Sequence, residues 1–164
     1  MKYKLVNVHG PLGVGKSNLM GLLKKAFSSF VYVDRPRIKR GLKALEKPIA
    51  LKLSKDVSFY LLDKLMDLKA NIFTEEISPK HLVSNFKDKL SDYELISFYL
   101  TCSVDEAISR DLTRGKTVVG ESRVRQIHSE YRAPESYEIV LNTEESSVEE
   151  VFSEMVKRIK SPTS

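Results

Sequence analysis

The sequence predicts a single α/β domain built on a five-stranded, mostly parallel β-sheet that is flanked by helices. Short apolar runs alternate with segments of helical periodicity along the whole chain, which is the pattern of parallel strands joined by helices. The first apolar run also leads into a glycine-rich turn, Gly10 to Ser17, and then into a helical segment. No repeat or linker divides the 164 residues. We therefore expect one domain over residues 1–160 and a flexible tail over 161–164.

The elements can be predicted in order from local signals. In the first half of the chain, apolar and β-branched residues predict strands at residues 5–8, 30–33 and 70–74. Apolar residues at helical spacing predict helices at residues 18–27, 37–45 and 49–68. Pro36 suits the first turn of the second helix, because its missing N–H would have no partner there.

The second half continues the alternation. Strands are expected at residues 93–100 and 137–141, and helices at residues 79–90, 104–113, 121–131 and 148–159. Ser78, Ser103 and Ser147 each precede a predicted helix and are expected to cap it. The carboxyl ends of parallel strands meet at one edge of a sheet, where ligands of such folds bind. Residues that follow strands one, two and three should therefore share one crevice.

The composition fits a folded globular protein. Hydrophobic residues make up 41% and charged residues 30%, and the longest apolar runs are too short to cross a bilayer. The chain starts with a predicted strand and shows no signal-peptide pattern, so we expect a cytoplasmic protein without a membrane partner. The net charge of +5 is compatible with an anionic substrate. Cys102 is the only cysteine and is expected to be a packed thiol rather than a nucleophile.

The most specific motif is the glycine-rich turn, which fits the spacing G-x-x-x-x-G-K-[ST] and has a strand before it and a helix after it. Backbone N–H groups of such a turn and the following helix N-terminus converge on a phosphate. Lys16 would reach the β- and γ-phosphates, and the Ser17 hydroxyl would ligate Mg²⁺. The motif predicts a P-loop NTPase domain. The expected ATP-binding residues are Gly10, Pro11, Leu12, Gly13, Val14, Gly15, Lys16, Ser17 and the adjoining Asn18.

A second candidate site follows the second strand. Asp34 could be the general base that accepts the proton of an attacking hydroxyl, or it could only cap the next helix. Arg37, one turn later, could hold an anionic part of the acceptor. Arg40 belongs to the same basic segment, which has few acids between residues 31 and 54. This excess of positive charge favours a phosphate-bearing acceptor, such as the end of a nucleic acid.

The lid and the metal site are predicted from two further patterns. Arg110 and Arg114 lie four residues apart on one helix face and are followed by Gly115, so they could close over a triphosphate. The alternative is a pair of surface arginines that form ion pairs with nearby acids. Glu75 and Glu76 follow the third strand, where either could help to hold Mg²⁺, with Glu75 our assignment. They could instead be acids that respond to the dipole of the next helix.

In this order of motifs, the chain resembles the small phosphate-loop kinases, and most of all the bacteriophage-type 5′-hydroxyl polynucleotide kinase domain. Arg110-x-x-x-Arg114-Gly115 is similar to the lid of that family. The adenylylsulfate kinases are also similar, at Ile77-Ser78-Pro79 and at Tyr131–Glu135. The resemblance implies that Asp34 is the general base, that Arg37 binds the acceptor phosphate and that the lid arginines contact the donor phosphates.

The chain also departs from these families. Asn18 stands where they usually have threonine, the acceptor motif is reduced to Asp34-Arg35-Pro36-Arg37, and a glutamate takes the place of the aspartate after the third strand. The motif Asp-x-x-Arg recurs among nucleotide and small-molecule kinases. It therefore supports a kinase better than it supports any one acceptor.

The sequence therefore predicts an ATP- and Mg²⁺-dependent phosphotransferase with Lys16, Asp34, Arg110 and Arg114 as catalytic residues and Thr143 near the base of the nucleotide. The expected acceptor is a polynucleotide 5′-hydroxyl, with a nucleoside, a nucleotide or adenylylsulfate as alternatives. A nucleotide-binding switch or ATPase without an acceptor is an alternative of another class. A degenerate kinase fold that only binds its ligands is a third. The sequence is silent on the oligomeric state and does not distinguish ATP from GTP.

Overall fold

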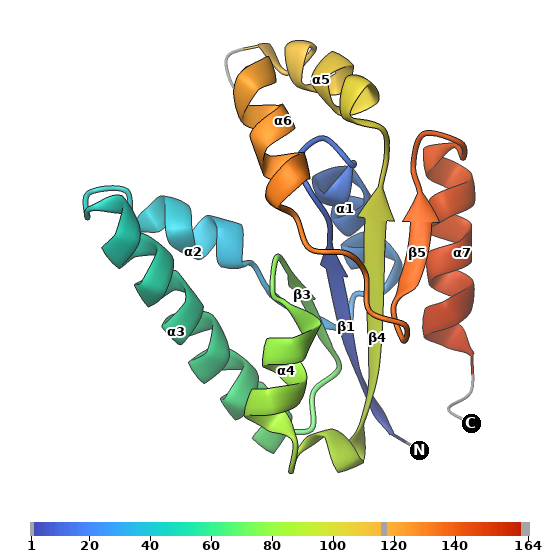
Figure 1. Cartoon of the computed structure of the whole chain (residues 1–164). Coiled ribbons are helices and arrows are strands. Elements are labelled where there is room, and N and C mark those ends of the chain that lie inside the picture. Colours follow the sequence, from blue (N-terminus) through green and yellow to red (C-terminus); the bar gives the residue numbers. More distant parts are fainter. Residues whose placement is uncertain (1, 116–117, 162–164) are drawn as a thin grey trace.

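The structure, a computed structural model, describes residues 2–115 and 118–161 and contains the expected parallel sheet (Figure 1). The five strands lie in the order β2-β3-β1-β4-β5, and every neighbouring pair is parallel. The predicted tail at 161–164 falls outside the described residues except for Ser161. The strand bounds are β1 Tyr3–His9, β2 Val31–Val33, β3 Ile72–Glu75, β4 Tyr93–Thr101 and β5 Ile139–Asn142.

Helices cover both faces of the sheet, as Figure 1 shows. On one face α1 (Lys16–Ala26) and α7 (Val148–Lys160) contribute to one apolar core, and on the other α3 (Lys47–Asp67) and α4 (Pro79–Phe86) contribute to a second. The remaining elements are α2 (Arg35–Gly41), the 3-10 helix η1 (Leu90–Asp92), α5 (Val104–Leu112) and α6 (Glu121–Glu130). Among the described residues, no helix is long and apolar enough to cross a membrane.

Successive side chains of β1 point to opposite faces of the sheet, which explains why there are two cores. Leu5 points to the core under α3 and α4, whereas Val6 and Val8 point to the core under α1 and α7. All three side chains are fully buried. Cys102 packs in the core under α1 and α7, and burial raises the pKa of its thiol, as expected for a structural cysteine.

Several predicted boundaries need correction. Helix α2 begins at Arg35 rather than at residue 37, because Asp34 is its N-cap and accepts a hydrogen bond from the Arg37 N–H at 2.8 Å. Helix α4 ends at Phe86 rather than at residue 90. Ser103 and Ser147 cap their helices through their side chains, as predicted. Ser78 takes the N-cap position of α4, but its side chain makes no capping bond.

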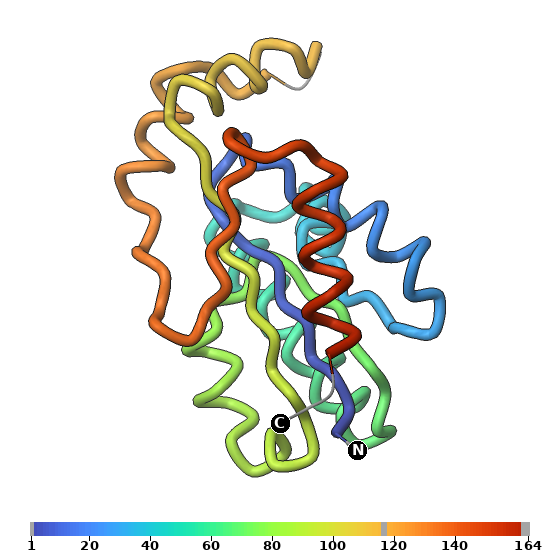
Figure 2. Tube along the Cα trace, turned by 90° about the vertical axis from the view of Figure 1, so that its right-hand side faces the viewer, coloured from blue at the N-terminus to red at the C-terminus, as the bar shows by residue number. Residues whose placement is uncertain are grey.

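The sheet register brings the candidate site together at one edge. Val8 of β1 pairs with Glu75 of β3, and Val33 of β2 pairs with Thr74, so the three strands end at nearly the same level. Figure 2 shows α5 and α6 at the same end of the molecule as the loop between β1 and α1. The glycine-rich loop, Asp34, Glu75 and the predicted lid therefore meet at the carboxyl edge of the sheet.

Candidate functional site

A cavity of about 780 Å³ opens at this edge of the sheet. Its volume is within the range of small-molecule sites, roughly 300–1,000 Å³. Most of the residues expected to bind ATP, the acceptor or the metal line it. These lining residues are Leu12, Gly13, Val14, Gly15, Lys16, Ser17, Asn18, Asp34, Arg40, Glu75, Glu76, Arg110, Arg114 and Thr143.

The floor of the cavity is the loop before α1, whose shape depends on glycine. Gly13 has a φ of 85°, and a Cβ at this position would lie 2.8 Å from the Cα of Ala107 in α5. A Cβ on Gly10 would lie 2.3 Å from the carbonyl oxygen of Leu100. Only glycine allows these approaches, and the resulting turn aims backbone N–H groups and the N-terminus of α1 into the cavity. That helix has no acidic residue in its first turn, so its positive end is left for an external anion.

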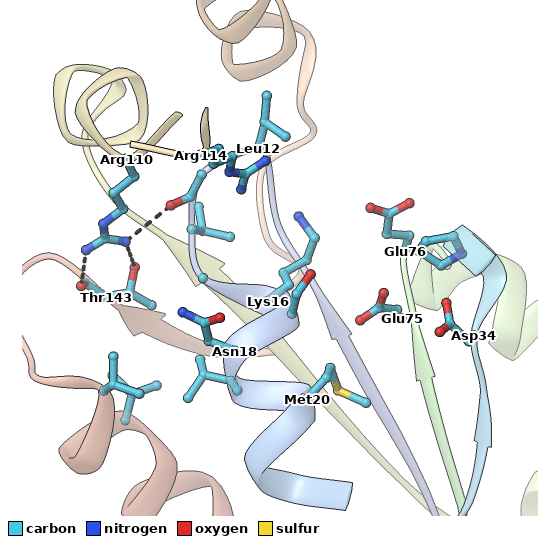
Figure 3. A pocket seen from close by; sticks show the side chains of 18 of the residues that line it. Leu12, Lys16, Asn18, Met20, Asp34, Glu75, Glu76, Arg110, Arg114 and Thr143 are labelled. Atoms are coloured by element: carbon cyan, nitrogen blue, oxygen red, sulfur yellow. Dashed lines mark hydrogen bonds between the residues drawn. The ribbon is translucent and has the colours of Figure 1, made fainter. Parts of the chain in front are cut away.

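Lys16 lies at the centre of the cavity, between its two sides (Figure 3). Its Nζ donates hydrogen bonds to the carbonyl oxygens of Gly10 and Pro11, at 2.8 and 2.7 Å. Burial lowers the pKa of this amine, and the carboxylates of Glu76 and Glu75 act in the opposite direction. The positive charge is thus held in a partly desolvated place, where its attraction for a phosphate is stronger than in water.

Acidic side chains form one side of the cavity. In Figure 3 the side chains of Asp34, Glu75 and Glu76 lie together on the side of Lys16 away from Arg110. Burial raises the pKa of Glu75, a hydrogen bond with Tyr32 opposes this change, and the carboxylates of Glu76 and Asp34 raise the pKa further. One oxygen of Glu75, Oε2, is buried without a hydrogen-bond partner. A cation or a proton would stabilise this group of acids.

Arg110 forms the opposite side, and its guanidinium is held in place by several partners (Figure 3). It donates to the Thr143 hydroxyl at 2.9 Å, to the Thr143 carbonyl oxygen at 2.7 Å and to the Gly13 carbonyl oxygen at 3.3 Å. Its Nε also donates to Glu106 at 2.7 Å. Arg110 therefore joins α5, the phosphate loop and the turn after β5. The alternative of a surface arginine paired with nearby acids accounts only for the bond to Glu106.

Asp111, a residue not assigned from the sequence, organises the predicted lid. This side chain is buried, and its Oδ2 accepts the N–H groups of Val119 and Gly120, both at 2.9 Å, just before α6 begins. The guanidinium of Arg114 lies 4.0 Å from its other oxygen. Asp111 thus fixes the residues that lead into α6 and lies beside Arg114, which lines the cavity. Residues 116–117, which follow Gly115 in the predicted lid, lie outside the described residues.

A buried polar network ties the phosphate loop to the chain after the lid. Glu138 accepts hydrogen bonds from His9 Nε2, from Ser97 Oγ at 2.9 Å and from Arg132 Nη2 at 2.8 Å. Tyr131 accepts the N–H of Gly10 at 2.9 Å and lies 3.2 Å from His9 Nδ1. With Nε2 protonated towards Glu138, Nδ1 of His9 accepts the hydroxyl proton of Tyr131.

The sequence could not assign these network residues a role, because they are brought together from four separate segments. His9 stands directly before the glycine-rich loop, and Tyr131 opens the segment that resembles the adenylylsulfate kinases. Their positions in the sequence were therefore a weak indication that both lie near the site. Glu138 had no such indication. Conversely, the exposed Arg37 does not line the cavity, so its predicted contact with the acceptor has no support from the geometry.

Neither a protein-family model nor a curated protein sequence matches this chain. Among solved structures, a presumed kinase from Chloroflexus aurantiacus is 12% identical, with a TM-score of 0.78 over 99% of this chain and 98% of that one. The APS kinase CysC of Mycobacterium tuberculosis, in complex with AMPPNP and APS, is 18% identical, with a TM-score of 0.67 over 98% of this chain and 99% of that one.

A third similar structure is the Pnkp1/Rnl/Hen1 RNA repair complex, which is 15% identical, with a TM-score of 0.65 over 78% of this chain and 43% of the matched one. Two of these three similar structures carry kinase names and the third is an RNA repair complex. At such low identities the likeness concerns the fold alone. This chain has the fold of the small P-loop kinases.

Proposed function

We propose that the protein is an ATP-dependent phosphotransferase that moves the γ-phosphoryl group of ATP to a hydroxyl acceptor. The observation that carries this proposal is that the phosphate loop with Lys16 and the carboxylate of Asp34 line the same cavity. A carboxylate at this place would receive the proton of an attacking hydroxyl. The kinase folds among similar structures agree with this reading.

The reaction would proceed with the triphosphate on the loop and the acceptor hydroxyl beside Asp34. The hydroxyl oxygen forms a bond to the γ-phosphorus, the bond from that phosphorus to the β,γ-bridging oxygen breaks, and the hydroxyl proton passes to Asp34. One oxygen of Asp34 accepts the Arg37 N–H, so the other is the one that takes the proton. Lys16 and Arg114 would stabilise the charge on the transferred group. Arg110, held beside Thr143, is better placed for the nucleoside part of the donor.

The residues present fit a magnesium ion bound together with the nucleotide. Among the described residues there is no cluster of three or more metal-ligating side chains. Mg²⁺ usually takes one or two protein ligands, phosphate oxygens and water, so such a cluster is not required. The Ser17 hydroxyl and the unpartnered Oε2 of Glu75 would hold the ion. When bound, it would neutralise charge on the β- and γ-phosphates.

For the acceptor we propose a polynucleotide 5′-hydroxyl. The support is the basic segment that begins at Arg35, of which Arg40 lines the cavity. The likeness to an RNA repair complex points the same way, whereas the likeness to an APS kinase keeps adenylylsulfate as an alternative, beside a nucleoside or nucleotide. A cytoplasmic location belongs to this proposal, since ATP is the ordinary phosphate donor there.

The test is transfer of ³²P from γ-labelled ATP to 5′-hydroxyl oligonucleotides, nucleosides, nucleotides and adenylylsulfate, measured in parallel. Asp34→Asn keeps an oxygen that can accept the capping N–H but loses the base, so we expect ATP binding to persist and transfer to fall by at least about 10²-fold. Asp88→Asn, an exposed change that lines no part of the cavity, is the control. ATP hydrolysis that Asp34→Asn leaves unchanged, without transfer to any acceptor, would favour the switch or ATPase instead.

A further inference from the structure

A second cavity, of about 340 Å³, adjoins the first one on the far side of Glu76. Glu76 lines both cavities, so they meet at the group of acids opposite Lys16. The second cavity lies between α2, α3, the turn after β3 and the segment that follows α6. Its charged and aromatic lining includes Arg35, Lys55, Phe59, Glu76, Tyr131 and Arg132.

Two cations in this lining have no carboxylate partner. Among the described residues, neither Arg35 nor Lys55 forms an ion pair, although both are half-buried. The Nη1 of Arg35 donates to the carbonyl oxygen of Glu76 at 2.7 Å, and its Nε is buried without a hydrogen-bond partner. Arg132, by contrast, is paired with Glu138. Both side chains line the cavity and carry a positive charge without a carboxylate partner among the described residues, so the cavity is suited to an anion that Arg35 and Lys55 can share.

The other carboxylates of the lining do not remove this preference. Glu130 accepts a hydrogen bond from Gln126 on the exposed side of α6. Glu76 faces the first cavity as well and raises the pKa of Glu75 there. The His81 side chain also lines the second cavity.

Aromatic side chains give the cavity a second kind of surface. Phe59 lies on α3 one turn after Lys55, whose Nζ is 5.6 Å from the centre of the ring. Tyr131, which follows α6, also lines the cavity. A cavity with unpaired cations and aromatic rings can accommodate a planar base and an attached phosphate. At about 340 Å³ it has room for one nucleotide unit rather than for a folded partner.

We propose that this second cavity binds the acceptor, and that Arg35 and Lys55 hold a phosphate carried by a nucleotide unit whose free hydroxyl reaches past Glu76 to Asp34. The proposal rests on the proposed function for the direction of the hydroxyl. It assigns the anion contact to Arg35 instead of the exposed Arg37, which lines neither cavity. The nucleotide unit could be free or could be the end of a nucleic acid.

Binding can be measured without any reaction. With a non-hydrolysable ATP analogue at saturation, calorimetry would compare a nucleoside 3′-monophosphate with the same nucleoside lacking the phosphate. We expect the phosphorylated compound to bind at least about tenfold more tightly, as one charge-assisted hydrogen bond provides. Arg35→Gln and Lys55→Ala should each weaken its binding by about tenfold and leave binding of the nucleoside unchanged. Lys52→Ala removes an exposed charge from the same helix, outside both cavities, and should change neither.

The outcomes separate this inference from the proposed function. Equal affinity for both compounds, or phosphate binding that neither Arg35→Gln nor Lys55→Ala weakens, would overturn the inference even if the enzyme transfers phosphate. Selective binding without transfer to any hydroxyl would leave the inference standing and overturn the proposed function. Lys55→Ala keeps the result decisive if Arg35→Gln disturbs folding, because Lys55 makes no bond to the turn at Glu76. A 5′-hydroxyl oligonucleotide as third ligand distinguishes a free nucleotide from the end of a nucleic acid. If the oligonucleotide binds more tightly than the nucleoside 3′-monophosphate, and with a steeper dependence on salt, the acceptor is a nucleic-acid end.

Discussion

Replacing Glu138 by alanine should destabilise the protein more than most single substitutions, because this carboxylate is the centre of the buried network. Its side chain is fully buried and accepts four hydrogen bonds, from His9, Ser97, Arg132 and the N–H of Glu135. These bonds hold the pKa of Glu138 below its ordinary value although burial acts against ionisation. The alanine variant would leave these donors without their acceptor.

The magnitude follows from the charge that is left behind. Removing one partner of a buried ion pair costs about 3–5 kcal/mol, since the remaining charge loses its compensation. A domain has a free energy of unfolding of roughly 5–15 kcal/mol, so the variant would lose a large share of its stability. At about 2–4 °C per kcal/mol for a chain of this size, the midpoint of thermal unfolding should fall by roughly 6–20 °C. Glu138→Gln keeps the volume and one acceptor oxygen, so its loss should be smaller.

Urea unfolding followed by circular dichroism measures the effect, provided that the denaturant slope stays unchanged. The matched control is Glu154→Ala, which breaks an exposed pair with Arg158 on α7 and should cost no more than about 0.5 kcal/mol. The two changes delete the same side chain, once from a buried network and once from a surface pair. A loss below about 1 kcal/mol for Glu138→Ala would refute the network as a source of stability.

Three further predictions concern the loop, the network and the junction of the cavities. Gly13→Ala should strain the phosphate loop, because the added Cβ would lie 2.8 Å from Ala107. A titration should show ATP binding weakened by at least about tenfold, whereas unchanged affinity would contradict the loop geometry. Burial lowers the pKa of His9 in the folded protein, so below about pH 6.5 the unfolded chain binds more protons than the folded one and the free energy of unfolding should fall. Urea titrations at several pH values should find a smaller loss in His9→Gln. Glu76 has a φ of 58°, so Glu76→Gly should be about 1 kcal/mol more stable than Glu76→Ala in the same assay, whereas the reverse order would exclude strain there.

The fold and the floor of the site could be predicted because their signals are local. The alternation of apolar runs predicts the sheet, and the spacing of Gly10–Ser17 predicts the loop with its strand and helix. The edge shared by Asp34 and Glu75 followed from a topology rule that needs only parallel strands. The boundaries were less certain, since the start of α2 depends on Asp34 acting as its N-cap.

The walls of the site could not be predicted in the same way. The contacts of Glu138 with His9 span 129 residues, and no periodicity or spacing reports a contact of that range. The choice between Arg35 and Arg37 depends on where a seven-residue helix begins and how it is rotated against α3. The family resemblance pointed to Arg37 because this residue fits the motif Asp-x-x-Arg. The structure points to Arg35 instead, because this half-buried residue lines a cavity.

The two cavities suggest why acids and cations are separated in this site. Donor phosphates in the first cavity would repel an acceptor phosphate at short range, so an acceptor anion is best held away from Lys16 while its hydroxyl stays close. Glu76 stands between the cavities, and its backbone carbonyl already orients Arg35 towards the second one. A carboxylate at this junction disfavours phosphate in the passage and leaves it open to a neutral hydroxyl. The same charge pattern would then keep the two phosphates apart and bring the reacting oxygen to Asp34.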